Sequence, residues 1–426
     1  MELLRISKPD RILTGTIALE GSKSISNRAL IVLALAGADP AEWLENLSVS
    51  KDTTTLYRLL TQKGSSFDAG DAGTTFRFMT AFLALRNGVQ VLTGSSRMRE
   101  RPIGGLVEGL RSIGANIEYL EKAGYPPLRI GEMHPRGGPA RVRINAGTSS
   151  QFLSALLMIG PYLPDGLELV PEGPLVSRPY LEMTVQLMRH FGAGVVWSDG
   201  SVAVSPGAYR ARPFVVESDW SAASYWYALA ALADEADINL QGLFAESWQV
   251  DSVLIKMMQT FGVRTTAMPP ELVLGTPVAL RLEKSGPVVE KHFEWDFTDC
   301  PDIAQTLAVV CAGLGAKGTF SGLETLYVKE TDRVAAIQTE LAKTGVTFTE
   351  LPGSPGKFEL NGRANWNAPP RFATYGDHRM AMSFAALGML KPVVIEHPAV
   401  VAKSYPTFWG HLTQAGFHCE RREEHS

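Results

Sequence analysis

Residues 24–38 read SISNRALIVLALAGA, a segment in which small polar residues open a helix that is apolar on most of its faces. A helix that is apolar all round is typical of a buried position. We therefore predict six buried helices, because five more segments repeat the pattern: GTTFRFMTAFLAL from Gly73, SSQFLSALLMIG from Ser149, SAASYWYALAALA from Ser221, PDIAQTLAVVCAGLGA from Pro301 and DHRMAMSFAALGML from Asp377.

A second set of helices alternates with the first. These segments are amphipathic, and each ends at a glycine, the residue that most readily adopts the left-handed conformation of a helix C-cap. Strand-like runs such as Ala140 to Ile144 separate the helices. The six predicted helix ends are at Gly64, Gly114, Gly192, Gly262, Gly345 and Gly416.

The alternation predicts six copies of one α+β repeat, each with a buried and an exposed helix, three copies in each of two domains. A solenoid is the alternative, but these repeats are roughly 70 to 80 residues long, whereas common solenoid repeats have about 20 to 50. We expect one domain to hold both termini and to comprise residues 1–17 and 218–426. The other domain is expected to comprise residues 18–217.

Composition limits the class of protein. The chain has 426 residues, 45% of them hydrophobic and 20% charged, which is enough to bury a large core. A formal charge of −4, with lysine and arginine scattered, argues against a nucleic-acid partner. The three cysteines show no metal or disulfide spacing, and no apolar run is long enough to span a membrane. We expect a cytoplasmic monomer with no metal and no membrane partner.

Cations lie at the N-terminal ends of the buried helices, where free amide groups and the helix dipole favour anions. Capping explains serine, threonine and aspartate at such positions. It does not explain cations, which the dipole disfavours there. We therefore predict that these helix ends bind anionic ligands in one cleft. The cations are Lys23, Arg28, Arg77 and Arg379.

Three helix starts carry groups suited to phosphate. The run GSKS at residues 21–24 resembles the end of a nucleotide-binding P-loop, but Gly15 lies one residue too far upstream, so ATP or GTP is not expected. GDAGTTFR at residues 70–77 offers glycine for close approach, and GTSSQ at residues 147–151 offers hydroxyls and an amide. A plain turn or cap is the alternative for each. Of the arginines in the basic loop 95–103, at most one or two are expected to bind a ligand.

Two acidic groups complete the predicted site. Asp302 opens a helix, and Glu330 follows Lys329 in VKETDR at residues 328–333. Exposed ion pairs are the simpler explanation of such charges. In a cleft lined by arginine the same groups can transfer protons, because burial and neighbouring cations shift their pKa values. We expect His378 to be structural or to cap its helix.

Seven motifs lie in order across nearly the whole chain: GSKSISNR (21–28), GDAGTTFRF (70–78), RERPIG (99–104), SSQFLSALLM (149–158), SRPY (177–180), VKETDR (328–333) and GDHRMAM (376–382). Together they resemble the 5-enolpyruvylshikimate-3-phosphate (EPSP) synthase family of enolpyruvyl transferases. The resemblance implies an inside-out α/β barrel fold of two domains, each with three βαβαββ repeats, that close over the substrates in the cleft between them.

The resemblance also implies an activity. Members transfer the enolpyruvyl group of phosphoenolpyruvate to the 5-hydroxyl of shikimate-3-phosphate and release phosphate, in the shikimate pathway to chorismate and the aromatic amino acids, with no metal or organic cofactor. Shikimate-3-phosphate would be held by Ser24, Arg28, Ser149, Ser150, Gln151 and Ser177, with Lys329 and Asp302 at its reacting hydroxyl. Phosphoenolpyruvate would be held by Lys23, Gly73, Arg101, Arg333, Arg379 and Lys403.

By the same resemblance, the reaction is an addition followed by an elimination. Asp302 or Lys329 would take the hydroxyl proton, and Glu330 or Lys23 would protonate the methylene carbon. The chain departs from the family at Asp71 and Thr325, where asparagine is common. Its stretch Gln62–Ala69 is shorter than is usual in the family, and we expect it to lack a strand. Gly73 is retained, which predicts inhibition by glyphosate.

Two other functions remain open. The related UDP-N-acetylglucosamine enolpyruvyl transferases usually carry a reactive cysteine in a mobile loop, but the corresponding residues 94–104 contain none. A non-catalytic anion-binding protein on the same fold would not need Asp302, Lys329 and Glu330 together.

Overall fold

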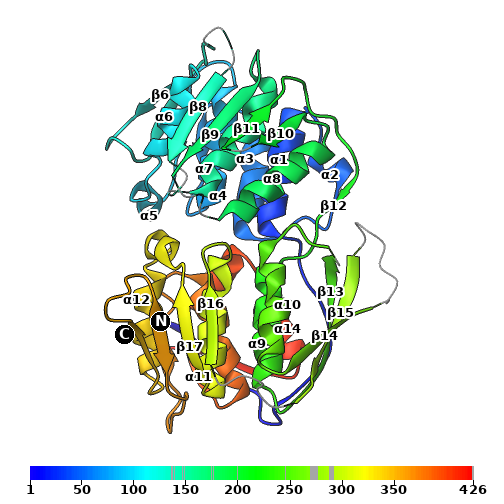
Figure 1. The fold of residues 1–426 in the computed structure, drawn as a ribbon, viewed down its shortest axis with the longest axis vertical. Helices are drawn as coiled ribbons and strands as arrows, with labels where there is room; N and C mark the ends of the chain where they lie inside the picture. Colours follow the sequence, from blue (N-terminus) through cyan, green and yellow to red (C-terminus); the bar gives the residue numbers. More distant parts are fainter. Residues whose placement is uncertain are drawn as a thin grey trace. The chain divides into compact units, whose positions relative to one another are not determined.

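The computed structural model describes residues 1–135, 138, 140–145, 147, 149–173, 175, 177–198, 200–244, 246–268, 277–286 and 292–424. The chain divides into two compact domains (Figure 1). The terminal domain comprises Met1–Glu20 and Glu217–Ser426, and the central domain comprises Gly21–Val216.

The six buried helices predicted from the sequence are present. In each domain three of them contact one another and so form its centre. Those of the central domain are α1 (Lys23–Leu35), α4 (Gly73–Ala84) and α7 (Ser150–Ile159), and those of the terminal domain are α9 (Trp220–Leu232), α11 (Ala304–Leu314) and α13 (His378–Ala385).

Six outer helices alternate with the buried ones, as predicted. Each is followed by a glycine with φ between 75° and 114°, so the expected left-handed C-terminal glycines are confirmed. The outer helices are α3 (Lys51–Thr61), α6 (Gly104–Ser112), α8 (Arg178–His190), α10 (Leu254–Gln259), α12 (Arg333–Ala342) and α14 (Phe408–Gln414).

Five repeats share one sheet topology. The first two strands are parallel, the last two are antiparallel to each other, and the sheet order is first, second, fourth, third. In the central domain these strands are β4 (Ser66–Asp68), β5 (Gln90–Thr93), β6 (Asn116–Tyr119) and β7 (Leu128–Gly131), followed by β8 (Ala140–Asn145), β9 (Leu167–Glu172), β10 (Val195–Ser198) and β11 (Ser201–Val204).

The terminal domain has three such sheets. Strand β1 (Glu2–Ser7), from the start of the chain, completes the repeat whose other strands come last. The remaining strands are β2 (Ile12–Ala18), β13 (Glu235–Phe244), β14 (Val263–Met268), β15 (Pro277–Lys284), β16 (His292–Asp296), β17 (Lys317–Ser321), β18 (Thr347–Glu350), β19 (Phe358–Asn361), β20 (Arg371–Phe372), β21 (Val393–Glu396) and β22 (His418–Glu423).

The remaining repeat, around α1, departs from the expected pattern. Among the described residues its sheet consists of β12 (Phe214–Val215) and β3 (Leu44–Glu45), paired in parallel. Between the end of α3 and the start of β4 lie only residues 62–65, which are too few for the hairpin of the other repeats. The prediction of six complete βαβαββ repeats is therefore corrected to five complete repeats and one short one, and the shortened segment is where the strands are missing.

Short helices join these elements. None of the helices in the described ranges is both long and apolar enough to cross a bilayer. The short helices are α2 (Pro40–Trp43), α5 (Ser96–Arg99), η1 (Gly160–Tyr162), η2 (Val250–Val253), η3 (Pro301–Ile303), η4 (Glu324–Val328), η5 (Ala386–Met389) and η6 (Pro398–Lys403), where η marks a 3-10 helix.

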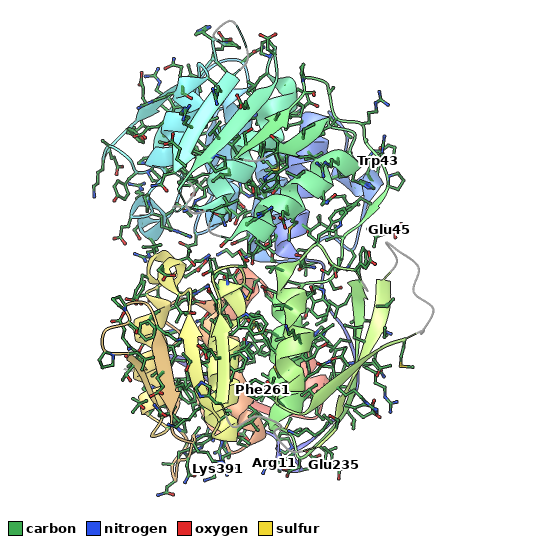
Figure 2. All side chains as sticks on the ribbon, in the orientation of Figure 1. Arg11, Trp43, Glu45, Glu235, Phe261 and Lys391 are labelled. Carbon is green, nitrogen blue, oxygen red and sulfur yellow. The ribbon has the colours of Figure 1, made fainter. Side chains whose placement is uncertain are left out.

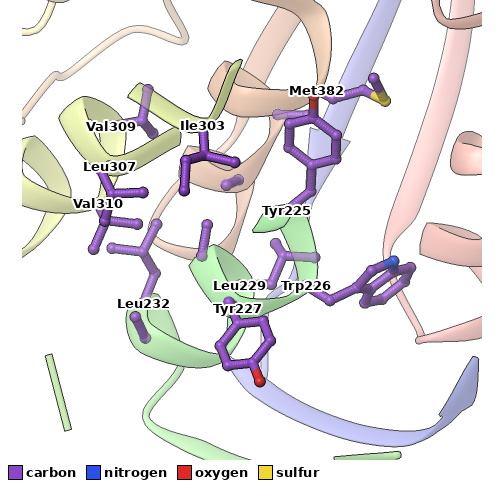
Figure 3. Packing of buried hydrophobic residues seen from close by; sticks show 14 of the residues in the cluster. Tyr225, Trp226, Tyr227, Leu229, Leu232, Ile303, Leu307, Val309, Val310 and Met382 are labelled. Carbon is purple, nitrogen blue, oxygen red and sulfur yellow. The ribbon is translucent and has the colours of Figure 1, made fainter. Parts of the chain in front are cut away.

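Each domain has its own apolar core. In the terminal domain, one buried cluster joins Tyr225, Trp226 and Leu229 of α9 with Leu307 and Val310 of α11 (Figure 3). Charged side chains such as those of Arg11, Glu235 and Lys391 lie at the surface of the same domain, whereas Phe261 is fully buried (Figure 2). The cores fix the buried helices, and thereby fix where their N-terminal ends lie.

Candidate functional site

In the central domain, side-chain hydrogen bonds join the starts of three helices. Lys23, the first residue of α1, places its Nζ atom 3.3 Å from Oδ2 of Asp52. Asp52 lies in the first turn of α3, and its backbone oxygen accepts a hydrogen bond of 2.9 Å from Thr75 of α4. Lys23, which is predicted to bind a ligand, therefore lies where α1, α3 and α4 begin.

The start of α7 joins the same group. Nε2 of Gln151 donates to Oγ1 of Thr74 at 2.9 Å, which links α7 to α4. Ser149 caps α7, because its hydroxyl accepts from the backbone N–H of Gln151, and Ser150 beside it is partly exposed. Thr148, from the same predicted phosphate-binding run, lies outside the described residues.

Gly73 and Arg101 lie in contact at the start of α4. A Cβ atom on Gly73 would lie 2.5 Å from Nη1 of Arg101 and 2.7 Å from Nη1 of Arg77. Only glycine leaves room for these two guanidinium groups. Within the described residues, the buried Nε atom of Arg101 has no hydrogen-bond partner, which suits a side chain that binds a ligand.

Arg28 is engaged mainly by protein atoms. Its side chain is buried and donates to Oγ1 of Thr184 at 2.7 Å, to the backbone oxygen of Ser24 at 2.8 Å and to Oγ of Ser154 at 3.2 Å. Burial lowers the pKa of Arg28 to about 10, so it remains charged at neutral pH. The geometry assigns Arg28 at least a role in fixing Ser24.

Ser177 has an unusual backbone. It precedes α8 with a φ of 56°, in the left-handed region that residues with a side chain seldom adopt, and its hydroxyl does not cap the helix. Such strain is found preferentially at functional sites. The side chain of Ser177 therefore has a role other than capping α8.

In the terminal domain, Arg333 connects three carboxylates. Only 2% of its side chain is exposed. Its Nε atom donates to Oδ2 of Asp377 at 2.7 Å, Nη1 donates to Oδ1 of Asp302 at 3.0 Å, and Nη2 donates to Oε2 of Glu330 at 2.9 Å. One planar guanidinium therefore holds the starts of α12 and α13 and the turn η3 before α11 in a fixed arrangement.

Asp302 is surrounded by cations. Besides Arg333, Nη2 of Arg379 lies 2.9 Å from its Oδ2 atom, and Nζ of Lys329 lies 3.9 Å from its Oδ1 atom. Burial alone would raise the pKa of Asp302, but the three cations outweigh it and hold that pKa well below its usual range. Desolvation lowers the pKa of Lys329, and Asp302 partly opposes this effect. The pair combines a permanently ionised carboxylate with an ammonium that gives up its proton more readily than usual.

Glu330 is held between two cations. Its Oε2 atom accepts from Arg333, and Nζ of Lys403 lies 3.1 Å from its Oε1 atom. The structure therefore brings all of the predicted terminal-domain residues into one connected network: Asp302, Lys329, Glu330, Arg333, Arg379 and Lys403. A set of four cations around two carboxylates can bind an anion and exchange protons with it.

A model of the family described as EPSP synthase (3-phosphoshikimate 1-carboxyvinyltransferase) matches residues 37–412. The chain belongs to the EPSP synthase family. A 3-phosphoshikimate 1-carboxyvinyltransferase of Bacteroides fragilis (strain YCH46) is 45% identical to it over 421 residues, covering 98% of this chain and 99% of that protein. One of Cellvibrio japonicus (strain Ueda107) is 36% identical and covers 97% and 99%.

A solved structure of EPSP synthase from Acinetobacter baumannii has the same fold. Its TM-score to this chain is 0.79 at 21% sequence identity, and the match covers 99% of this chain and 100% of that one. The two-domain fold expected from the sequence motifs is thereby confirmed.

Two departures from the EPSP synthase motifs have distinct surroundings. Asp71 is exposed and accepts a hydrogen bond from the hydroxyl of Ser95. Thr325, in η4, has a buried hydroxyl that lacks a hydrogen-bond partner among the described residues. The carboxylate of Asp71 is thus held by the basic loop, whereas the hydroxyl of Thr325 is unsatisfied.

The structure also reveals polar residues that the sequence did not single out. Asp52 pairs with Lys23. Asp251, in η2, is buried and accepts a hydrogen bond from the hydroxyl of Ser221 at the start of α9. Asp52 had one local signal, its place in the first turn after the capping Ser50, whereas Asp251 had none.

The carboxyl group of Asp251 should give the protein a measurable pH dependence. Burial raises its pKa to about 7, helped by the charges of Asp302 and Asp219 and opposed by Ser221 and Arg379. Because the folded-state pKa exceeds the unfolded value of 3.8, the stabilising contribution of this group is full below about pH 4 and is lost as the pH rises to about 7.

We therefore expect Asp251→Asn, which cannot ionise, to become more stable relative to the wild type as the pH rises. Urea unfolding at pH 4.5 and pH 8 measures this difference. Asp237→Asn is the control, since Asp237 is exposed and its hydrogen bond to Arg281 lowers its pKa. A stability difference for Asp251→Asn that is the same at both pH values would contradict the expectation.

Proposed function

We propose that this chain transfers the enolpyruvyl group of phosphoenolpyruvate to the 5-hydroxyl of shikimate-3-phosphate and releases phosphate. The network in which Arg333 joins Asp302 and Glu330, with Lys329 beside Asp302, carries the proposal. Binding alone would not require two carboxylates among these cations, but proton transfer does. Membership of the EPSP synthase family agrees with this reaction.

Two anionic substrates account for the cations of both domains. We propose that Arg333, Arg379 and Lys403 of the terminal domain and Lys23, Gly73 and Arg101 of the central domain bind phosphoenolpyruvate. Arginine suits both groups of that substrate, because its planar fork matches carboxylate and phosphate alike. Placing the two reactants side by side is itself a large part of catalysis.

Shikimate-3-phosphate is proposed to bind at the hydroxyl-rich helix starts of the central domain. There Ser149 and Gln151 mark the start of α7, and the N-terminal amides of a helix favour phosphate. Asp302 and Lys329 would hold the reacting hydroxyl. The other proposed contacts are Ser24, Arg28, Ser150 and Ser177.

The pKa directions distinguish the candidate bases. A carboxylate whose pKa is strongly depressed is a weak base, which disfavours Asp302 as the proton acceptor. The lowered pKa of Lys329 favours it, with Asp302 orienting the amine and the hydroxyl. Glu330 is the proposed proton donor to the methylene carbon, and Lys23 is the alternative donor.

Phosphate release tests the proposal. The purified protein is incubated with phosphoenolpyruvate and either shikimate-3-phosphate or UDP-N-acetylglucosamine, with Asp302→Ala run beside it. We expect release only with shikimate-3-phosphate, and none from the variant. Release with UDP-N-acetylglucosamine, or with neither acceptor, would overturn the substrate assignment.

We also propose that the protein is a cytoplasmic monomer. The free thiols of Cys300, Cys311 and Cys419 are compatible with a reducing compartment. Sedimentation analysis of the purified chain tests the monomer.

Gly73→Ala is expected to weaken inhibition by glyphosate by about tenfold or more, since the added methyl group would displace Arg101 and Arg77. The Michaelis constant for phosphoenolpyruvate should rise as well. Inhibition curves for phosphate release measure both effects. Gly410→Ala is the control, because that glycine lies in helix α14 and its added methyl group meets no atom within 4 Å. If glyphosate inhibited Gly73→Ala as strongly as the wild type, the proposed role of Gly73 in binding would be contradicted.

A further inference from the structure

Helix α12 holds the segment before α13 at two points. Arg333, in its first turn, binds Asp377, the N-cap of α13. Glu340 lies about two turns further along, on the same face, and is fully buried. Its Oε1 atom accepts from the hydroxyl of Tyr375 at 2.7 Å, and its Oε2 atom accepts from the backbone N–H of Ala373 at 3.1 Å. Only the first of these two attachments belongs to the network described above.

The second attachment holds a strained turn. Tyr375 has a φ of 53° and Gly376 follows with 68°, so two successive residues are left-handed. This conformation is disfavoured for a residue with a Cβ atom, and for an aromatic residue it is a genuine outlier. Strain of this kind persists only where the surrounding contacts determine the conformation. The hydrogen bonds of Glu340 are such contacts.

The strained turn determines the positions of Asp377 and Arg379, which follow it. The backbone N–H of Asp377 donates to the oxygen of Thr374 at 2.8 Å, which closes the turn. Oδ1 of Asp377 then accepts from the N–H of Arg379 at 2.8 Å, and the Arg379 side chain extends to Asp302. A change in the turn therefore moves Asp377 and Arg379 together.

We propose that Glu340 and Tyr375 form a positioning clamp that holds residues 373–377 in the conformation that aims Arg379 at phosphoenolpyruvate. The inference rests on the proposed function, which it deepens by naming residues that act through Arg379. Neither Glu340 nor Tyr375 has to touch the substrate for the clamp to set its affinity.

The surroundings of Glu340 fit this role. Nζ of Lys343 lies 2.6 Å from Oε2 of Glu340 and also donates to the backbone oxygen of Arg371 at 2.7 Å, so Lys343 links the carboxylate to the segment that precedes the turn. Partial burial, together with the hydrogen bond to Glu340, raises the pKa of Tyr375 to about 12. The phenol therefore remains a hydrogen-bond donor at any pH at which the enzyme would be assayed.

Three substitutions of Tyr375 separate the hydroxyl from the backbone strain. Tyr375 is 42% exposed, so the variants should fold. We expect Tyr375→Phe to raise the Michaelis constant for phosphoenolpyruvate about fivefold, the loss of roughly one hydrogen bond, with kcat within about twofold of the wild type. Tyr375→Ala should raise it further. Tyr375→Gly should recover part of that loss, because glycine adopts the left-handed turn without strain.

A merely structural role of the tyrosine would not produce this order, since glycine would then be the more disruptive replacement. Tyr57→Phe, a partly buried tyrosine of α3, is the matched control and should leave both constants unchanged. Glu340→Gln keeps a hydrogen-bond acceptor, so its Michaelis constant for phosphoenolpyruvate should lie between those of the wild type and Tyr375→Ala. Michaelis constants for phosphoenolpyruvate in the Tyr375 variants equal to the wild type, while the wild type releases phosphate, would overturn the clamp and leave the proposed function intact.

A second measurement does not depend on turnover. Amide hydrogen exchange of residues 373–379, followed by mass spectrometry, should be faster in Tyr375→Ala than in the wild type and intermediate in Tyr375→Gly. Unchanged exchange would overturn the clamp whatever the reaction catalysed. A wild type that released no phosphate would instead overturn the proposed function, and the exchange result would still decide the clamp.

Discussion

Arg333→Met is expected to lower the free energy of unfolding by about 3 to 5 kcal/mol, because it removes the cation from three buried or partly buried carboxylates at once. Asp302, Glu330 and Asp377 each accept one hydrogen bond from this guanidinium. Turnover should be lost as well, since the starts of α12 and α13 are no longer joined. Arg333→Lys should be intermediate in stability, because it restores the charge but not the three directed donors. Urea unfolding at pH 7.5 measures the difference.

The matched control is Arg264→Met in the same domain. Arg264 lies 2.8 Å from Glu283, but its side chain is 64% exposed, and exposed ion pairs contribute about 1 kcal/mol or less. If Arg333→Met and Arg264→Met lowered the free energy of unfolding by similar amounts, the buried network would contribute no more to stability than an exposed ion pair.

Asp302→Asn is expected to reduce kcat for phosphate release by roughly 10²- to 10⁴-fold, the range typical of a lost acid–base group. The replacement keeps the shape of the side chain but removes the charge that faces Arg379, Arg333 and Lys329. Since Asp302 opposes the lowering of the Lys329 pKa, that pKa should fall further in the variant. If Lys329 is the base, the acidic limb of the pH–rate profile should move to lower pH.

Phosphate release at saturating substrates between pH 5 and pH 9 provides both readouts. Asp237→Asn, which removes an exposed carboxylate of the same domain, should leave kcat and the profile unchanged. A residual activity of Asp302→Asn close to that of the wild type would exclude a catalytic role for Asp302. A reduced kcat with an unshifted acidic limb would argue against Lys329 as the base.

Local pattern was sufficient to predict most of the secondary structure. A segment such as residues 24–38 is apolar on most of its faces, and such a helix is typical of a buried position. Glycines such as Gly345 marked the helix ends because the left-handed cap favours glycine irrespective of tertiary contacts. The shortness of the repeat around α1 was expected only from the comparison with the family motifs, since the length of residues 62–65 becomes informative only against other repeats.

The candidate site was predictable in part for a different reason. Arg333, Glu330 and Lys329 lie close together in sequence, and this local density of charge indicates a candidate site. Asp251 lies far from Asp302 along the chain, and only the fold makes the two charges interact. The acceptors of Arg28 on α7 and α8 were likewise invisible in its own helix. Polar partners that meet through tertiary packing leave no periodic signal in a single sequence.

The pairing of β1 with β21 and β22 has a consequence for how the chain is made. During synthesis β1 and β2 leave the ribosome before the central domain, yet their partners β13, β21 and β22 are translated only after the whole of Gly21–Val216. The central domain can complete its own core while β1 and β2 are still unpaired. Because Glu2 pairs with Glu423, a short peptide linker can join β22 to β1. Opening the joined chain elsewhere would then remove the delay between the synthesis of β1 and that of its partners. A circular permutant that begins near residue 217 would synthesise the terminal domain as one continuous segment, and it should fold with less exposure to aggregation.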